Sequence, residues 1–190
     1  MQRAGSLRLG SLANLKTQRM TMDEPNERDK SLRASAAQFF VASELCRRGF
    51  VASVTMGNTP NTDILVSDRE GTRFAHVQVK TFVPGNRTCS VGLKAERDYG
   101  HNFFWVLAGI PHPESERKFE CYIIRASVMA NEVREGHKRW LKTLGKKGQK
   151  HKDSTVRTVY LPPHKHPLTK WSIAKCKERW DLIGKKLQSL

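Results

Sequence analysis

The sequence predicts a protein of the α/β class, and three observations support that prediction. An amphipathic helix pattern occupies 31–48. Two apolar runs then flank a polar, glycine-containing segment between 61 and 81, which is typical of a β-hairpin. A continuous apolar run at 103–110 is typical of a strand buried on both faces. The 190 residues suffice for one such domain with a core plus an appendage.

The first expected element is a helix from Ser31 to Arg48. Its apolar residues recur at the spacing of one helix face, and Gly49 follows as the residue that ends it. Gln38 and Glu44 flank the apolar stripe on opposite edges. Either side chain is therefore placed to reach a site at the rim of the buried face, while Glu44 also suits a solvated boundary position. A strand at 50–55 and a loop at 56–62 are expected next.

The hairpin at 61–81 carries the polar side chains of greatest interest. Side chains alternate along a strand, so His76, Gln78 and Lys80 share one face with Phe74. The apolar residues between them take the opposite face and can pack into a core. A charged lysine inside such a strand is costly unless it is paired or used.

An expected turn at 68–71 sets the register of this hairpin. It puts Asp63 opposite His76, with Gln78 as the diagonal neighbour of Asp63 at about 7–8 Å between Cα atoms. A carboxylate, an amide oxygen and the Lys80 ammonium then converge from one rigid hairpin. A single metal ion fits between the first two groups.

Further strands are expected near 89–93, at 103–110 and at 119–124, with a connection at 94–102. Ser127 is expected to cap a helix that runs towards Glu135 or beyond. The segment 170–187 has a weaker helical pattern, in which Trp180 and Ile183 are expected to dock the helix to the core.

The net charge of +16 is unevenly distributed along the chain. Residues 23–132 hold 14 Lys/Arg and 14 Asp/Glu, residues 133–190 hold 16 against four, and residues 1–22 add four with no acid. A basic excess this concentrated indicates a polyanionic partner, chiefly DNA, with RNA or a solvated basic tail as the alternatives. The expected phosphate-binding side chains are Lys138, Arg139, Lys142, Lys146, Lys147, Lys150 and Lys152.

Composition divides the chain into three expected parts. Residues 1–30 are expected to be a disordered arm or the product of a misread start, with Met20 or Met22 as the true one, and organellar targeting by 1–22 stays open. Residues 31–135 are expected to form the folded core. Residues 136–190 are expected to form a basic C-terminal segment whose terminal helix packs on that core.

Membrane and zinc-binding proteins are disfavoured by the sequence. No run of 18 apolar residues occurs, so we expect a cytoplasmic protein that associates with the nucleoid when it binds DNA. The four cysteines are widely spaced and form no CxxC pair, so they are expected to be reduced, structural thiols. No Gly-rich phosphate loop or His-Glu-x-x-His motif is present.

A helix, then a hairpin with Asp followed by Gln-x-Lys, then a buried strand resembles the PD-(D/E)XK nuclease superfamily. The resemblance covers roughly 34–133 and rests on Ala37-Gln38 in the helix, on Asp63 in Asn-Thr-Asp-Ile-Leu-Val, and on Gln78-Val79-Lys80. The chain is similar to Holliday-junction resolvases, Mrr-like restriction enzymes and some small homing endonucleases. The resemblance implies a restriction-endonuclease-like αβββαβ core with a mixed central sheet.

The resemblance also implies roles for individual residues. Asp63 would be the main metal ligand, joined by Gln78 and the backbone carbonyl of Val79, and Lys80 would position or activate the attacking water. Oxygen ligands of this kind select Mg²⁺ or Mn²⁺. Gln78 stands at the second acidic position of the family, a variant that Mrr-like and some homing enzymes share.

A second carboxylate at the metal depends on the first helix. Gln38 stands where resolvases often carry Glu, so Glu44 is the other candidate. The candidate catalytic residues are therefore Asp63, Gln78, Lys80, Gln38 and Glu44.

The sequence favours a metal-dependent endonuclease that hydrolyses phosphodiester bonds in DNA. Two alternatives stay open: a non-catalytic nucleic-acid-binding relative of the nuclease fold, and a basic RNA-associated protein. A homodimer is expected from chemistry alone, because cutting two strands requires two sites.

Overall fold

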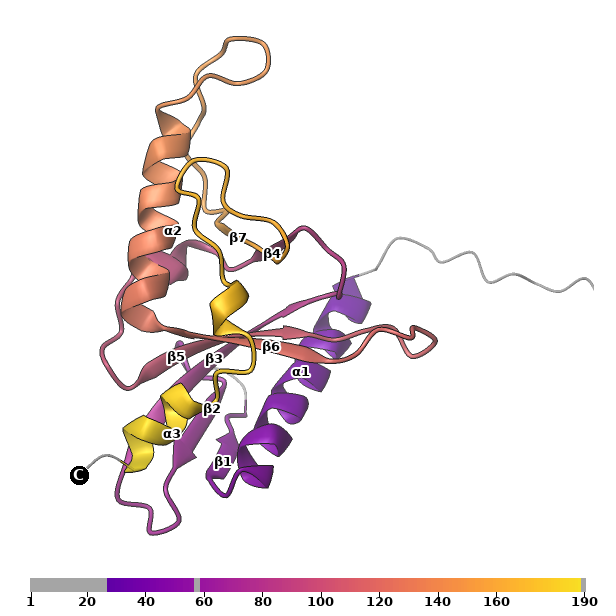
Figure 1. The fold of residues 1–190 in the computed structure, drawn as a ribbon, viewed down its shortest axis with the longest axis vertical. Coiled ribbons are helices and arrows are strands. Elements are labelled where there is room, and N and C mark those ends of the chain that lie inside the picture. The colour runs from indigo at the N-terminus through magenta and orange to yellow at the C-terminus, as the bar shows by residue number, and fades with distance from the viewer. Residues whose placement is uncertain (1–26, 57–58, 189–190) are drawn as a thin grey trace, which may run out of the picture.

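A computed structural model describes residues 27–56 and 59–188. A five-stranded sheet has the order β1-β2-β3-β5-β6, with β3 and β5 parallel and the other neighbours antiparallel. Its strands are β1 (Val51–Val54), β2 (Ile64–Ser67), β3 (Phe74–Phe82), β5 (Phe103–Gly109) and β6 (Glu120–Arg125). The expected α/β class with a mixed central sheet is confirmed. Figure 1 shows α1 on one side of this sheet and α2 rising from the other.

Helix α1 (Glu27–Arg47) begins four residues earlier than the sequence pattern indicates. At its end Gly49 has φ 89°, a conformation that glycine adopts without steric cost. Its N–H donates to the Cys46 carbonyl at 2.9 Å and the Phe50 N–H to the Leu45 carbonyl at 3.2 Å. These two bonds form a Schellman motif, which ends the helix where the sequence predicts.

Strand β5 is buried at every position, as its continuous apolar run predicts. Its alternate residues feed two separate cores, one on each face of the sheet. The core under α1 contains Val77, Val79 and Val106. The core under α2 contains Phe82 and Trp105. The alternation expected for β3 is therefore correct, and Gln78 and Lys80 lie on the α2 side of the sheet.

The crossover between β3 and β5 contains short elements in place of a long helix. These are β4 (Thr88–Ser90) and a 3₁₀ helix, η1 (Leu93–Glu96). Strand β4 leaves the main sheet and pairs antiparallel with β7 (Thr158–Tyr160) from the basic part of the chain. The C-terminal segment is thus built into the fold through a strand pair that the sequence did not indicate.

Helix α2 (Ala126–Leu141) runs beyond Glu135, within the predicted range, but its start differs from the prediction. Arg125, not Ser127, is the N-cap, and no side chain caps the helix there. The change of composition at 135/136 falls inside this helix, where Gly136 is buried. A glycine is needed at that position, because a Cβ would lie 2.8 Å from Nε2 of His166.

The end of the described chain packs on the α1 side of the sheet. After a 3₁₀ turn, η2 (Ala174–Cys176), comes helix α3 (Asp181–Gln188). Trp180, Ile183 and Leu187 are buried in the α1-side core, so the docking role predicted for the first two is correct. The predicted disordered arm was 1–30, but residues 27–30 belong to α1, so the prediction is wrong for them. Residues 1–26, which include the targeting prediction for 1–22, lie outside the described residues.

Two sequence expectations concern features of the whole chain. Within the described residues, no helix combines the length and the apolarity needed to cross a membrane. All four cysteines are free thiols, as expected. Burial raises the pKa of Cys121 far above its usual range, so this thiol is an inert part of the core.

Candidate active site

Asp63 directly precedes the first residue of β2, and its backbone is hydrogen-bonded to the strands on both sides. Its N–H donates to the Val77 carbonyl at 2.9 Å, and its carbonyl accepts the Thr55 N–H at 2.9 Å. The main chain of Asp63 therefore continues the sheet for one residue beyond the regular pairing of β2 with β3. This fixes where the side chain leaves the sheet.

The register of the hairpin corrects the sequence prediction by two residues. Ile64 pairs with Val77 and Leu65 with His76, so the Asp63 carboxylate meets Gln78 and not His76. A shift of two residues keeps every side chain on its predicted face, because the strand period is two. The shifted register brings the carboxylate and the amide into contact, closer together than the expected diagonal arrangement.

The longer turn explains this register. The turn closes between Asp68 and Arg73, whose N–H and carbonyl lie 3.2 Å apart. The Asp68 carboxylate accepts the Thr72 N–H and hydroxyl, both at 2.8 Å, and the Arg73 N–H at 3.2 Å. These hydrogen bonds stabilise the longer turn relative to a tighter one. The segment 68–73 thus forms the turn in place of 68–71.

One oxygen of Asp63 accepts two hydrogen bonds. Oδ2 accepts the amide Nε2 of Gln78 and, at 2.7 Å, the backbone N–H of Val79. In a regular sheet a backbone carbonyl of the adjacent strand would accept the Val79 N–H. Here the Asp63 side chain accepts it, and the Asp63 carbonyl accepts the Thr55 N–H instead. Gln78 is only 8% exposed, so its orientation is fixed. A carboxylate next to the amide directs Nε2 inward and leaves Oε1 as the free acceptor.

Three oxygen atoms at this place remain available. Val77 directs its carbonyl to Asp63, so strand alternation directs the Val79 carbonyl to the same edge, past the end of β2. Oδ1 of Asp63 and Oε1 of Gln78 accept no hydrogen bond within 27–56 and 59–188. Carboxylate, amide and carbonyl oxygens are ligands that Mg²⁺ and Mn²⁺ prefer. The described ranges contain no group of three or more His, Cys, Asp or Glu side chains that could hold a metal ion.

Lys80 lies two residues beyond Gln78 on the same face of β3. Its side chain is half-buried and has no carboxylate within ion-pair distance among the described residues. Its charge acts on Cys89 of β4, but burial dominates there and raises the pKa of that thiol to about 12. A partly desolvated, unpaired ammonium is costly to keep and is an effective group for an anionic ligand.

The loop before Asp63 is held by residues that sequence reasoning did not single out. The Thr62 hydroxyl lies 3.2 Å from Nδ1 of His76, and the Thr62 carbonyl accepts the Thr55 hydroxyl at 2.6 Å. Asn61 has φ 62°, and its side-chain oxygen accepts the Tyr99 hydroxyl at 3.4 Å. The only local signal was the Pro-Asn pair, since asparagine tolerates a left-handed backbone.

Gln38 and Glu44 lie on α1, which covers the other face of the sheet. The carboxylate of Glu44 accepts Arg47 at 3.0 Å and Arg48 at 2.5 Å. The hydrogen bond from Arg47, helped by Arg48, lowers the pKa of Glu44. Gln38 makes no hydrogen bond to Asp63, Gln78 or Lys80. The structure therefore brings Asp63, Gln78 and Val79 into contact, with Lys80 on the same face of β3 as Gln78, and joins neither helix residue to them.

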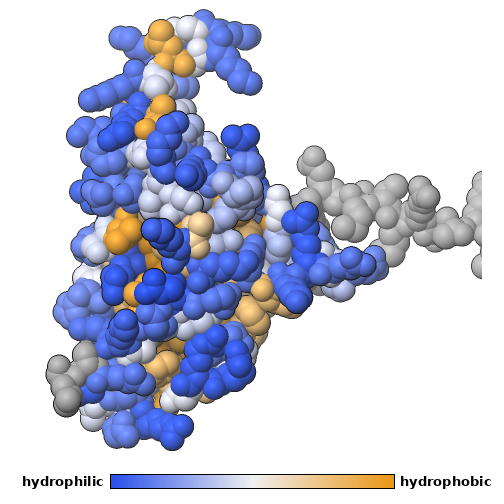
Figure 2. Space-filling view, viewed as in Figure 1, coloured by the Kyte–Doolittle hydropathy of each residue, from blue (hydrophilic) through white to orange (hydrophobic). Residues whose placement is uncertain are grey.

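The predicted phosphate-binding residues follow one another along α2 and beyond it. We call residues 142–152 the basic arm. Its tip is closed by a bridge between Leu144 and Lys150 and by the Gly145 N–H, which donates to the Gln149 carbonyl at 2.8 Å. Figures 1 and 2 show the arm projecting beyond the end of α2, with hydrophilic side chains around it. Exposed at the end of α2 and along the arm are Lys138, Arg139, Lys142, Lys146, Lys147, Lys150 and Lys152.

Helix α2 connects this basic region to the face that carries Lys80. The Arg134 guanidinium donates to the Glu96 carbonyl of η1 at 3.0 Å. Past η1, Arg97 lies over the Tyr99 ring at 5.2 Å, and Tyr99 bonds to the loop before Asp63. Cationic side chains thus lead from the arm to the neighbourhood of Asp63 on one side of the molecule.

Comparisons with known proteins find a likeness among solved structures. No family model matches the chain, and no curated protein matches it. Among solved structures, a bacterial homing endonuclease, I-Ssp6803I, is similar over 83% of this chain and 93% of that chain, with a TM-score of 0.49 and 18% sequence identity.

Proposed function

We propose that the chain is a metal-dependent endonuclease that hydrolyses phosphodiester bonds in DNA, with a site of the PD-(D/E)XK type. The observation that carries the proposal is the contact of Asp63 with both Gln78 and the Val79 N–H. Lys80 lies on the same face of the same strand. Three free oxygens next to one another, with a cation on the same face of β3, support a site built on the order Asp, then Gln-x-Lys on the adjacent strand.

Asp63, Gln78 and the Val79 carbonyl would hold Mg²⁺ or Mn²⁺. The donor set fits such an ion, because all its atoms are hard oxygens and none is a thiolate or imidazole. When bound, the ion would stabilise the extra charge of the attacked phosphate and lower the pKa of a water. The chain supplies one formal negative charge for it, so affinity depends on how well the oxygens are oriented.

The residues around the oxygens provide that orientation. Two donors hold Oδ2 of Asp63, so Oδ1 keeps one direction in the absence of any ligand. Lys80 supplies a positive charge close to the oxygens, where the phosphate becomes more negative as it is attacked. An ammonium without a carboxylate partner can also donate a hydrogen bond to the attacking water and position it.

The basic arm and α2 would hold the DNA backbone. Seven exposed Lys and Arg side chains lie there, on the side of the sheet that carries Lys80. Such contacts displace counterions from the phosphates and give affinity without sequence readout. The hairpin would thus carry the catalytic site, and the arm would bind the DNA.

A plasmid-nicking assay tests the proposal. Supercoiled DNA is incubated with the protein in Mg²⁺, in Mn²⁺ and in chelator, beside Lys80→Ala and the control Lys30→Ala, an exposed residue of α1. We expect nicking that requires metal, is lost in Lys80→Ala and persists in the control. Equal nicking by the Lys80→Ala variant would contradict the assignment of the site.

A non-catalytic DNA-binding protein is the second candidate. One observation favours it: Asp63 is the only carboxylate that the described residues bring to the cluster. This function predicts duplex binding with no metal-dependent nicking. The same assay, read beside a binding titration on DNA and on RNA of equal length, separates it from the enzyme and from an RNA-associated protein.

A further inference from the structure

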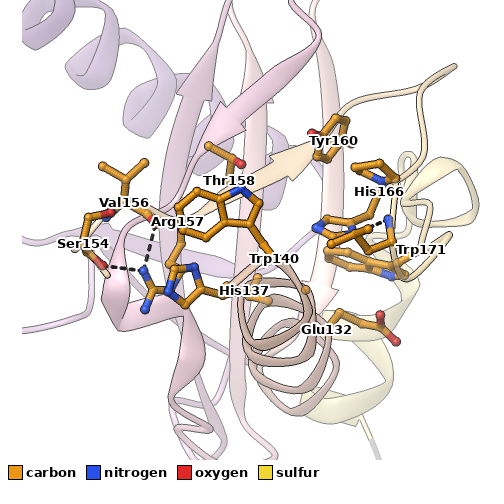
Figure 3. Close-up of a pocket in the computed structure, with 14 residues that line it drawn as sticks. Glu132, His137, Trp140, Ser154, Val156, Arg157, Thr158, Tyr160, His166 and Trp171 are labelled. Carbon is orange, nitrogen blue, oxygen red and sulfur yellow. Dashed lines mark hydrogen bonds between the residues drawn. The ribbon is translucent and has the colours of Figure 1, made fainter. Parts of the chain in front are cut away.

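A cavity of about 330 Å³ lies between α2 and the segment 154–171, away from the Asp63 cluster. Ligand sites generally measure about 300–1,000 Å³, so this cavity suits a ligand no larger than a nucleoside. The proposed nuclease chemistry makes no use of it. Figure 3 shows Trp140 rising from α2 on one side and Tyr160, His166 and Trp171 gathered on the other.

Flat rings form much of the cavity wall. Trp140 stacks with His137 at 5.4 Å and with His151 of the arm at 4.0 Å, measured between ring centroids. Tyr160 meets the His166 ring edge-on at 5.4 Å. These contacts fix the orientation of the Trp140 and Tyr160 rings. Trp171 contacts no other aromatic ring among the described residues, so its face is the wall on which a planar ligand can stack.

Polar groups around the slot remain unbonded. The Glu132 carboxylate, the Tyr160 hydroxyl and the indole N–H of Trp171 have no hydrogen-bond partner among the described residues. The guanidinium of Arg157, by contrast, is engaged by Glu96, by two backbone carbonyls at 2.6 and 2.9 Å and by the Asp153 carboxylate at 3.6 Å. A carboxylate acceptor beside hydroxyl and N–H donors matches the mixed donor and acceptor edge of a nucleobase.

His166 is a fixed part of the cavity wall. Its Nδ1 accepts the backbone N–H of Leu168 at 3.3 Å and of Thr169 at 3.2 Å. Burial, reinforced by the charge of Arg139, lowers the pKa of His166. The ring is therefore neutral at pH 7, with its proton on Nε2.

Positive charge lies at the rim of the cavity. The Arg139 guanidinium donates to the Leu168 carbonyl at 3.3 Å, which holds it beside the opening. Lys138 is exposed next to it, and the basic arm begins three residues after Arg139. A ligand for this place thus combines a planar polar ring with a negative charge.

We infer that the cavity takes one unpaired base of the nucleic acid bound by the basic arm, with the phosphate of that nucleotide beside Arg139. This inference rests on the proposed DNA binding. Aromatic side chains that stack on a base occur wherever proteins hold unpaired nucleotides. The site would let the protein prefer DNA with a bulged or frayed base over fully paired DNA.

A blocking variant tests the inference in the full chain. Thr158 of β7 lines the cavity and is exposed, so Thr158→Phe fills it with a residue that suits a strand. Ser43→Phe, at an exposed position of α1 on the other face of the sheet, is the matched control. The probes are a paired duplex and the same duplex with a single bulged 2-aminopurine, at fixed salt.

We expect the parent and the Ser43→Phe control to bind the bulged DNA about tenfold more tightly than the paired duplex. Stacking in the slot should quench the 2-aminopurine fluorescence. Thr158→Phe should bind both DNAs equally and show no quenching, with its affinity for the paired duplex unchanged. Competition by free dAMP against the bulged probe, in the parent only, would show that a single nucleotide is sufficient.

Equal binding of both DNAs by the parent, or quenching that survives in Thr158→Phe, overturns the inference while DNA binding stands. Absence of binding to the paired duplex overturns the proposed function and this inference with it. Tyr160→Phe is the second variant, because it keeps the ring and removes only the unbonded hydroxyl. It should reduce the preference for the bulge, and an unreduced preference counts against base recognition in the cavity.

Discussion

Replacement of Asp63 by asparagine separates the chemical role of the carboxylate from its structural role. The substitution keeps the size of the side chain and removes its charge. Oδ2 accepts two hydrogen bonds, from Gln78 and from the Val79 N–H, and an amide oxygen can accept both in its place. Bonds to a charged acceptor contribute about 1.5–3 kcal/mol each and neutral ones about 0.5–1.5 kcal/mol. The expected loss of stability is therefore about 2 kcal/mol.

The expected loss of activity is much larger than this loss of stability implies. The substitution removes the carboxylate of the cluster, so the ion is no longer held and the water no longer activated. Metal effects of this kind contribute several kcal/mol, and cleavage should fall by at least about 100-fold. DNA binding without metal should persist or improve, because a negative charge near the phosphates has gone.

Asp68→Asn is the matched control from the same hairpin. Asp68 also accepts backbone and side-chain hydrogen bonds, from Thr72 and Arg73, but it does so in the turn. Burial opposes the change, yet the bonds from Thr72 and Arg73 lower the pKa of Asp68. Asp68→Asn should lower the melting temperature and leave nicking intact.

The assays are melting curves with and without Mn²⁺ and plasmid nicking, all at one salt concentration. Mn²⁺ should raise the melting temperature of the parent and of Asp68→Asn, but not that of Asp63→Asn. Nicking by Asp63→Asn at the parental rate would refute the metal role of this residue. So would an equal Mn²⁺-induced stabilisation of the two asparagine variants.

Three further predictions follow from the same structure. Gln78→Glu puts a second carboxylate beside Asp63, and the two negative charges should lower the melting temperature in the absence of metal. The same variant should bind Mn²⁺ more tightly in calorimetry, and an unchanged affinity would mean that this position faces away from the ion. Replacing Lys146 and Lys147 by alanine should flatten the log–log salt dependence of DNA binding by up to about 0.9 for each phosphate that the protein no longer neutralises, and an unchanged slope would place the DNA elsewhere. His166 has a lowered pKa, so its contribution to stability is fully present above pH 6.5 and falls as pH drops through the folded-state pKa. His166→Asn keeps an acceptor for the two backbone N–H groups, and its melting temperature should no longer show that part of the pH dependence.

The sequence predicted the parts of the fold that depend on local pattern. Strand alternation put Gln78 and Lys80 on one face and Val79 on the other, and the burial of the 103–110 run followed from its composition. These features need only the side-chain period and hydrophobicity, which a single chain displays. The helix stop at Gly49 likewise follows from the conformation that one residue permits.

The register and the C-terminal part needed information that local pattern does not contain. The turn depends on hydrogen bonds of the Asp68 side chain, and only a small free energy separates this turn from a tighter one. The pairing of β4 with β7 joins residues about 70 positions apart, and both strands have only three residues. The cavity beside Tyr160 exists only because of that pairing, so no motif indicated it.

The bond from the Val79 N–H to Asp63 has a practical consequence for spectroscopy. In most sheets a backbone amide reports on another backbone group, but this one reports directly on a side chain whose charge and occupancy can change. Its proton and nitrogen resonances should move when the carboxylate is protonated or engages an ion, while those of the Val77 amide stay nearly constant. A single cross-peak in a two-dimensional proton–nitrogen NMR spectrum would then follow the state of the site during titrations, without a chemical probe attached to the protein.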